Sequence, residues 1–149
     1  MIKKETINNK NTLIISKNIN SNIFYSYITP NNNYDCGFIF GLNNLDDPLF
    51  AKNNYFMLII DKKGYLILSK FLSGTYWEIS KNRRKEIYNG FDKRNTYKLT
   101  INYVPYIGKI AVSLNDNIVF DIFDNSLNGR YVGFESLGKG TIFTQIMAE

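Results

Sequence analysis

Residues 55–68 read YFMLIIDKKGYLIL, two apolar runs of strand length joined by a short polar turn. Runs of β-branched and aromatic side chains with turn residues between them are typical of a β-hairpin. Gly64 ends the turn and accepts the positive φ that tight hairpin turns require. Because residues 55–60 are apolar at every position, we expect both faces of this strand to be covered. The stretch therefore predicts a hairpin at the centre of an antiparallel sheet.

The same pattern of short strands recurs along the chain about every ten residues. Residues 97–103 alternate, with Tyr97, Leu99, Ile101 and Tyr103 on one face and polar side chains on the other, as a sheet with one solvated face requires. No window of helical length carries an apolar stripe of helical spacing. We expect strands at residues 12–16, 22–29, 35–42, 54–61, 64–71, 75–80, 96–103, 108–114, 117–123, 129–135 and 140–147.

This pattern predicts an all-β fold, a single-domain antiparallel β-sandwich. The chain has 149 residues, of which 44% are hydrophobic and 21% charged, values that suit one globular domain. We assign residues 11–149 to the sandwich and residues 1–10 to an N-terminal segment that is free to fray. Alternation predicts that the core includes four phenylalanines, Phe38, Phe40, Phe120 and Phe134.

Composition excludes several classes of function. Histidine is absent and Cys36 is the single cysteine, which removes histidine-based catalytic dyads, histidine zinc sites and intrachain disulfides. The formal net charge is +5, but the basic residues are dense only in the run 81–85, so a nucleic-acid surface is not expected. The longest apolar run, residues 55–60, is too short to span a membrane. No signal-peptide pattern is present at the N-terminus, and localisation stays open.

Eight segments, in order, carry a resemblance to a known family over about residues 12–147. They are residues 35–40, 53–61, 64–70, 74–77, 97–101, 108–116, 129–135 and 141–143. Their order and the turn residues between them resemble the concanavalin A-like lectin/glucanase jelly roll, and in particular LamG-like carbohydrate-binding modules of fructan-active glycosidases. The resemblance implies a jelly-roll sandwich that binds carbohydrate and is not an enzyme. Members of the family often carry a basic residue after the Gly-x-x-Phe strand, where this sequence has Gly41.

Sugar binding requires aromatic faces together with polar groups that reach hydroxyls. Trp77 follows a Gly-Thr turn and precedes an acid, Tyr55 and Tyr76 lie at strand starts, and Asp35 shares a face with Gly37. The candidate carbohydrate-binding residues are Asp35, Tyr55, Tyr76, Trp77, Glu78 and Glu135.

Three alternatives remain beside a sugar-binding module. A glycosidase needs a pair of carboxylates, but the compact Glu-x-Asp-x-x-Glu strand of laminarinase-type relatives is absent, so no catalytic residues are expected. No cofactor is expected, and structural calcium stays an alternative. The partner would be a carbohydrate, or else another protein or a neighbouring domain bound by a sandwich that lacks a sugar site. The candidate calcium ligands are Asp46, Asp47, Asp61, Asp121 and Asp124.

Overall fold

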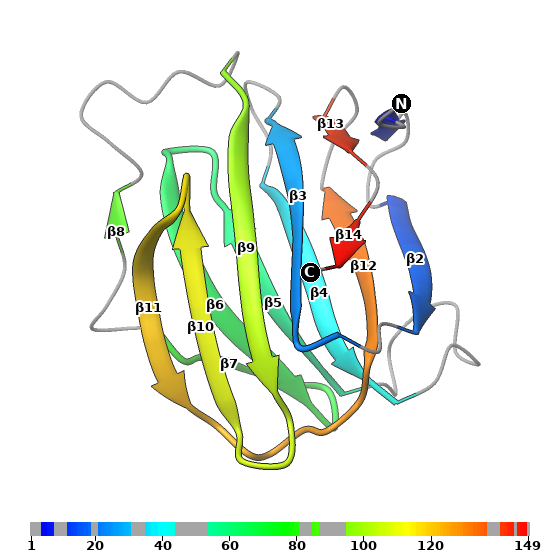
Figure 1. Cartoon of the computed structure of the whole chain (residues 1–149), viewed down its shortest axis with the longest axis vertical. Helices are drawn as coiled ribbons and strands as arrows, with labels where there is room; N and C mark the ends of the chain where they lie inside the picture. The colour runs from blue at the N-terminus through cyan, green and yellow to red at the C-terminus, as the bar shows by residue number, and fades with distance from the viewer. Residues whose placement is uncertain are drawn as a thin grey trace.

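The structure, a computed structural model, describes residues 4–7, 12–18, 21–30, 35–43, 54–80, 85–86, 95–136, 141–144 and 146–148. These residues form two antiparallel sheets that pack face to face (Figure 1). The described residues contain no helix, and hence none long and apolar enough to cross a membrane. The prediction of an all-β sandwich is therefore confirmed.

Sheet A lies in front in Figure 1. Its spatial order is β1 (Lys4–Ile7), β13 (Thr141–Thr144), β3 (Ile23–Thr29), β9 (Tyr97–Val104), β10 (Lys109–Leu114) and β11 (Asn117–Phe123), and β14 (Met147–Ala148) also pairs with β3.

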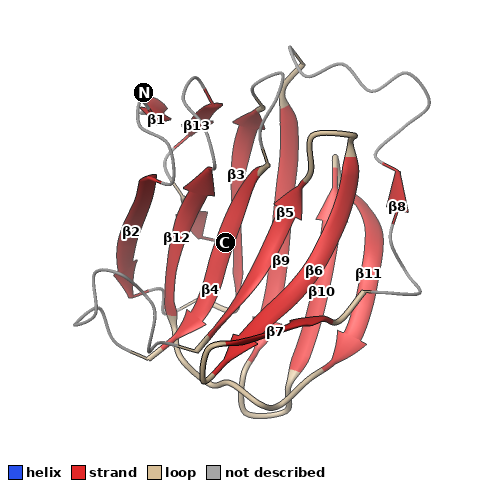
Figure 2. Ribbon diagram, turned by 180° about the vertical axis from the view of Figure 1, so that it is seen from behind, coloured by secondary structure: helices blue, strands red, loops and turns tan. Residues whose placement is uncertain are grey.

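Sheet B lies in front when the molecule is seen from behind (Figure 2). Its spatial order is β2 (Thr12–Asn18), β12 (Tyr131–Ser136), β4 (Cys36–Leu42), β5 (Tyr55–Ile60), β6 (Tyr65–Leu72) and β7 (Thr75–Glu78), and β8 (Lys85–Glu86) also pairs with β6.

Each expected strand is present, with its ends shifted by a few residues. The expected strand at residues 140–147 is divided into β13 and β14. Two strands were not expected, namely β1 within the segment 1–10 and the two-residue β8 in the basic run. Both are short pairings at sheet margins, which leave too few residues for a periodic signal.

The hairpin at residues 55–68 forms as expected, with β5 between β4 and β6. Asp61 Oδ1 accepts hydrogen bonds from the backbone N–H groups of Lys63 and Tyr65, both at 2.9 Å. Gly64 has a φ of 90°, a conformation that costs glycine little because it has no Cβ. The local turn chemistry thus sets the register of the two central strands.

Phenylalanine rings form a large part of the core between the sheets, together with leucine and isoleucine. The predicted core residues Phe38, Phe40, Phe120 and Phe134 are all buried. Phe134 of sheet B stacks on Phe143 of sheet A with ring centroids 4.2 Å apart. Such contacts add to the burial of apolar area that drives the two sheets together.

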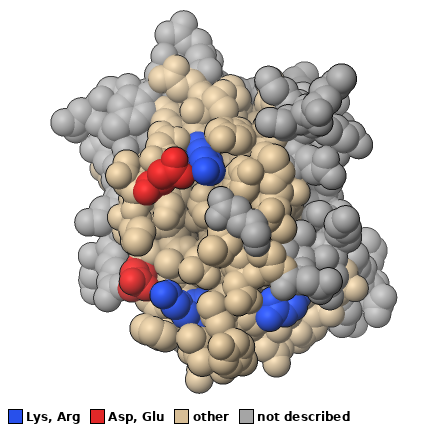
Figure 3. Space-filling view, viewed as in Figure 1, with Lys and Arg blue, Asp and Glu red and all other residues tan. Residues whose placement is uncertain are grey.

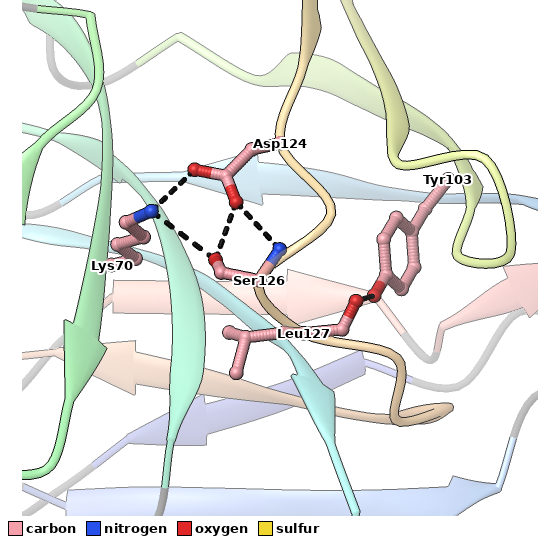
Figure 4. Close-up of polar contacts among 5 residues, drawn as sticks. All are labelled: Lys70, Tyr103, Asp124, Ser126 and Leu127. Carbon is pink, nitrogen blue, oxygen red and sulfur yellow. Dashed lines mark hydrogen bonds and ion pairs between the residues drawn. The ribbon is translucent and has the colours of Figure 1, made fainter.

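The crossover from β11 to β12 is joined to both sheets by polar contacts (Figure 4). The Nζ of Lys70 on β6 lies 2.6 Å from Asp124 Oδ2, and both side chains are largely shielded from solvent. Ser126 donates from its backbone N–H and its hydroxyl to Asp124 Oδ1. Beside this ion pair, the buried hydroxyl of Tyr103 on β9 donates to the carbonyl oxygen of Leu127 at 2.9 Å. These bonds hold the crossover in one path.

The same crossover ends at a glycine that the backbone requires. A Cβ at Gly129 would lie 2.1 Å from the carbonyl oxygen of Leu42. We expect Gly129→Ala to lower the free energy of unfolding by about 3 kcal/mol, because backbone atoms must move. Gly74 is a matched control, since its φ is +80° but a Cβ there meets nothing within 4 Å. Gly74→Ala should cost only about 1–2 kcal/mol. Urea denaturation measures both, and equal losses would contradict the steric account.

The ion pair predicts a pH-dependent contribution to stability. Burial alone would raise the pKa of Asp124, but hydrogen bonds from Lys70 and Ser126 and the charge of Lys70 together hold that pKa below its ordinary value. A lowered pKa stabilises the folded protein above the unfolded-state pKa, and this stability is lost as pH falls through the folded-state pKa. Asp124→Asn should therefore destabilise by about 1–3 kcal/mol at neutral pH, with the gap to wild type closing in acid.

The exposed pair of Lys98 and Asp116 serves as the control. Its atoms are 3.0 Å apart, but the Asp116 side chain is 77% exposed. Exposed pairs contribute about 0–1 kcal/mol, so Asp116→Asn should change stability little at any pH. Denaturation at a series of pH values tests both variants. A gap for Asp124→Asn that stays constant from neutral to acid pH would rule out this ion pair as its source.

Candidate functional site

The outer face of sheet B carries the candidate site. Side chains alternate along each strand, so residues between the core phenylalanines of sheet B point away from sheet A. The pairing register aligns Glu135 with Gly37, Gly37 with Ile59, and Ile59 with Ile67. One row across four strands therefore runs from an acid, past a glycine, to two isoleucines.

A pocket of about 160 Å³ opens on this face. It combines an apolar floor, one aromatic wall and an acidic side. The lining residues are Asp35, Met57, Ile59, Ile67, Tyr76 and Glu135. The floor comes from β5 and β6, the tyrosine from β7 and the acids from the β4–β12 side. Five segments of the chain thus meet in one hollow.

Gly37 lets β4 run close to β5 beside the pocket. It is the direct partner of Glu135 on the neighbouring strand. A Cβ there would lie 1.9 Å from the carbonyl oxygen of Leu58. The position therefore admits only glycine without a backbone shift.

The two acids differ in their surroundings. Asp35 Oδ1 accepts a hydrogen bond from the backbone N–H of Lys62 at 2.9 Å. Glu135 is largely buried, and burial followed by the negative charge of Asp35 raises the pKa of its carboxyl. Among the residues that the structure describes, none donates a hydrogen bond to Glu135 Oε2, which is itself buried. A buried carboxylate oxygen with no donor favours any ligand that supplies one.

Aromatic side chains continue from the pocket toward Tyr55. The ring of Tyr76 is edge-on to Phe71 with centroids 5.5 Å apart, and Phe71 lies 5.4 Å from Tyr55. Tyr55 packs against a second apolar cluster on the outer face, which includes Ile39 and Leu42. Burial, with a smaller effect of the Glu135 charge, raises the pKa of the Tyr55 hydroxyl to about 12. Tyr76 is 49% exposed, so its ring is open to a ligand.

The structure brings together three of the six candidate residues, because Asp35, Tyr76 and Glu135 line the pocket. Tyr55 lies two strands away from Tyr76 on the same face, with Phe71 of β6 between them, and Glu78 is on that face opposite Ser69. Neither lines the pocket.

Trp77 points the other way. It follows Tyr76 on β7 and pairs with Lys70, whose side chain extends toward Asp124 on the crossover from sheet A. Since neighbouring residues on a strand face opposite sides, Trp77 is on the side of β7 away from the pocket, where it is 53% exposed.

The floor of the pocket is not among the residues that the sequence pattern singles out. Met57, Ile59 and Ile67 belong to apolar runs, and such runs indicate burial on both faces without separating core from pocket. Gly37, a glycine inside a strand, marks the close approach of the β5 backbone at Leu58, so it does not point to the floor either.

Gly41 is closed to a ligand. Its φ is +78°, and a Cβ there would lie 2.9 Å from the ring of Phe56 and close to Leu127. The position that is basic in the resembling family thus faces core residues here, and it has no part in this pocket.

The candidate calcium ligands that the structure describes lie apart. Asp61 caps its own hairpin, Asp124 pairs with Lys70, and Asp121 is exposed on β11. Residues 46 and 47 lie outside the described residues. Within the part of the chain that the structure describes, no three acidic or cysteine side chains gather in a metal-binding group.

Other chemistry on the described surface is limited. Burial raises the pKa of Cys36 to about 12, more than its hydrogen bond to Thr141 lowers it, so this thiol is not a nucleophile. Residues 81–84 of the basic run lie outside the described residues. On the face shown in Figure 3, lysine and arginine are scattered singly among the described residues and form no stripe.

No protein-family model matches this sequence, and no curated protein sequence matches it. Solved structures do resemble it. The carbohydrate binding module CBM66 from Bacillus subtilis has a TM-score of 0.69 at 19% identity, over 97% of this chain and 93% of that chain. The Caenorhabditis elegans galectin LEC-6 has a TM-score of 0.61 at 13% identity, over 97% of this chain and 96% of that chain.

A Bacillus licheniformis β-glucanase has a TM-score of 0.57 at 7% identity, over 96% of this chain and 89% of that chain. Binding modules and glucanases thus share one architecture, and fold alone does not separate the two activities. These proteins are concanavalin A-like jelly-roll sandwiches, and this chain has the same fold.

Proposed function

We propose that the chain is a non-catalytic carbohydrate-binding module that holds one sugar ring in the pocket on the outer face of sheet B. The observation that supports this most directly is the meeting of Tyr76 with two carboxylates over an apolar floor. The likeness in fold to a carbohydrate binding module agrees with it.

The lining matches the two sides of a sugar ring. A sugar presents carbon-bound hydrogens on its faces and hydroxyl groups around its edge. The ring of Tyr76 and the side chains of Ile59 and Ile67 offer apolar surface to the faces. The carboxylates of Asp35 and Glu135 accept hydrogen bonds from hydroxyls, and charged acceptors make the stronger bonds.

The size of the pocket limits the ligand. Its volume is about 160 Å³, whereas pockets for drug-sized molecules commonly have about 300–1,000 Å³. One ring fits this space and an extended chain does not. The remainder of a longer saccharide would lie over the surface around the pocket.

The placement of the acids favours binding over hydrolysis. A glycosidase holds two carboxylates on either side of the bond that it cleaves. Here Glu135 is the strand partner of Gly37, and Asp35 is two positions from Gly37 on the same face. The two acids are therefore neighbours on one side of the pocket, with Tyr76 coming from the opposite side. They would hold two hydroxyls of one ring.

A glycan array tests the proposal with two neighbouring aromatic residues that face opposite ways. Fructans and β-glucans should be among the printed sugars. Tyr76→Ala removes the wall of the pocket, and we expect apparent affinity to fall about tenfold, which corresponds to ~1.4 kcal/mol. Trp77→Ala is the matched control and should bind as wild type does, because its side chain lies on the other side of β7.

Far-ultraviolet circular dichroism and thermal melting establish that both variants are folded. Loss of binding in Trp77→Ala with retention in Tyr76→Ala would refute this site and move it to the other side of β7. A folded wild type that binds no glycan would overturn the carbohydrate-binding function. Release of reducing sugar from a bound glycan would show that the module is an enzyme.

A further inference from the structure

The pocket is acidic although the chain as a whole is basic. The net charge of the chain is +5, but two of the six described residues that line the pocket are acids and none is lysine or arginine. The donor that reaches Asp35 Oδ1 is the backbone N–H of Lys62, which carries no charge. Charges farther away than about 8–10 Å are screened at physiological salt, so these nearby carboxylates decide which ligand charge is favoured.

Two lysines of the β5–β6 hairpin lie near the pocket. Lys62 and Lys63 line an adjoining cleft that shares Asp35 and Ile67 with the pocket. Both lysines are exposed, and water weakens the effect of an exposed charge on its neighbours. Neither lines the pocket itself.

Within the described part of the chain, the pocket lacks a hydrogen-bond donor for one oxygen of Glu135. Its Oε2 atom is buried, and no described residue donates to it. Asp35 lies close enough for its negative charge to act on the Glu135 carboxyl. A hydroxyl group would supply a donor to one of these oxygens, but it would leave the repulsion between the two acids in place. A group with several donors and a positive charge would relieve both.

We propose that this pocket selects sugars that carry a free, protonated amino group over the matching neutral sugars, and that it excludes uronic acids. This inference rests on the carbohydrate-binding function proposed above. An ammonium group has three donors and no acceptor, while a carboxylate only accepts. The group would lie between Asp35 and Glu135, with the sugar ring on the isoleucine floor and against Tyr76.

A metal ion fits this lining less well. Calcium takes six to eight oxygen ligands, but Met57, Ile59 and Ile67 offer it no side-chain oxygen. Their apolar surface suits the carbon-bound hydrogens of a ring that carries the cation.

Methyl-detected NMR titration of the full chain tests the inference. The methyl groups of Met57, Ile59 and Ile67 line the pocket and report its occupancy even when binding is weak. The probes are matched pairs, namely glucosamine with glucose, galactosamine with galactose, and mannosamine with mannose, together with glucuronate and galacturonate.

We expect at least one amino sugar to bind about fivefold more tightly than its neutral partner at low salt, as a partly shielded ion pair would allow. The ratio should shrink at high salt, where the Debye length falls to about 3 Å at 1 M. Neither uronate should shift the methyl signals.

Two variants test whether the preference for an amine comes from the pocket carboxylates or from the net charge of the chain. Glu135→Gln removes one pocket charge with little change of shape, and the ratio of amino to neutral affinity should fall to below about twofold. Asp116→Asn removes a charge from the exposed β10–β11 turn of sheet A, and it should leave the ratio unchanged. An equal fall in both variants would attribute the preference to net charge and overturn the inference.

The outcomes distinguish this inference from the proposed function. If glycans bind on the array but neutral sugars match or exceed their amino partners, the selection for an amine is wrong and the binding function stands. Binding of a uronate that shifts the same methyl signals would also show that the selection for an amine is wrong while the binding function stands. If no sugar binds in either experiment, the proposed function fails and this inference fails with it.

Discussion

The packing of phenylalanine rings between the two sheets is the interaction on which the rest of the structure depends. The ring centroid of Phe134 lies 4.2 Å from that of Phe143 in the opposite sheet and 5.4 Å from that of Phe38 on the neighbouring strand. Because a strand alternates its side chains, rings that point inward oblige the next residues, Glu135 and Gly37, to point outward. A slip of one residue would move the acid into the core. The packing of the core therefore also determines which residues of sheet B face the candidate site.

Gly37 connects the fold with the candidate site. The close approach of β5 excludes a side chain at this position, and Gly37 pairs with both Glu135 and Ile59, which line the pocket. The carboxylate of Glu135 is largely shielded from water, with one oxygen that no described residue supplies with a donor. The pocket is therefore held by packing, while a ligand would complete its polar contacts. Such unfinished polar groups are uncommon in folded proteins and are often found where something binds.

Much of the fold was predictable because its signals are local. The turn at residues 61–64, the alternation from Tyr97 to Tyr103 and the placement of Phe38 in the core follow from spacing along one strand. The site was predictable only in part. Asp35, Tyr76 and Glu135 could each be named as candidates. Alternation along β7 predicts that Tyr76 and Trp77 face opposite sides. Which of the two faces the pocket depends on how β7 pairs with β6, and a single strand does not show this. Met57 and Ile59 could not be told from core residues, since burial against another sheet and the floor of a pocket select the same apolar side chains.

By itself the sequence determined the class of fold, the positions of the strands along the chain and the exclusion of histidine and intrachain disulfide chemistry, because each of these depends on residue types and short-range spacing. Only the tertiary structure decided which residues share a site. Asp35 and Glu135 are far apart along the chain, and they meet because β12 pairs with β4 in one register. That register is set by how the inward side chains of both sheets fill the core together. A single strand carries no information about this joint packing.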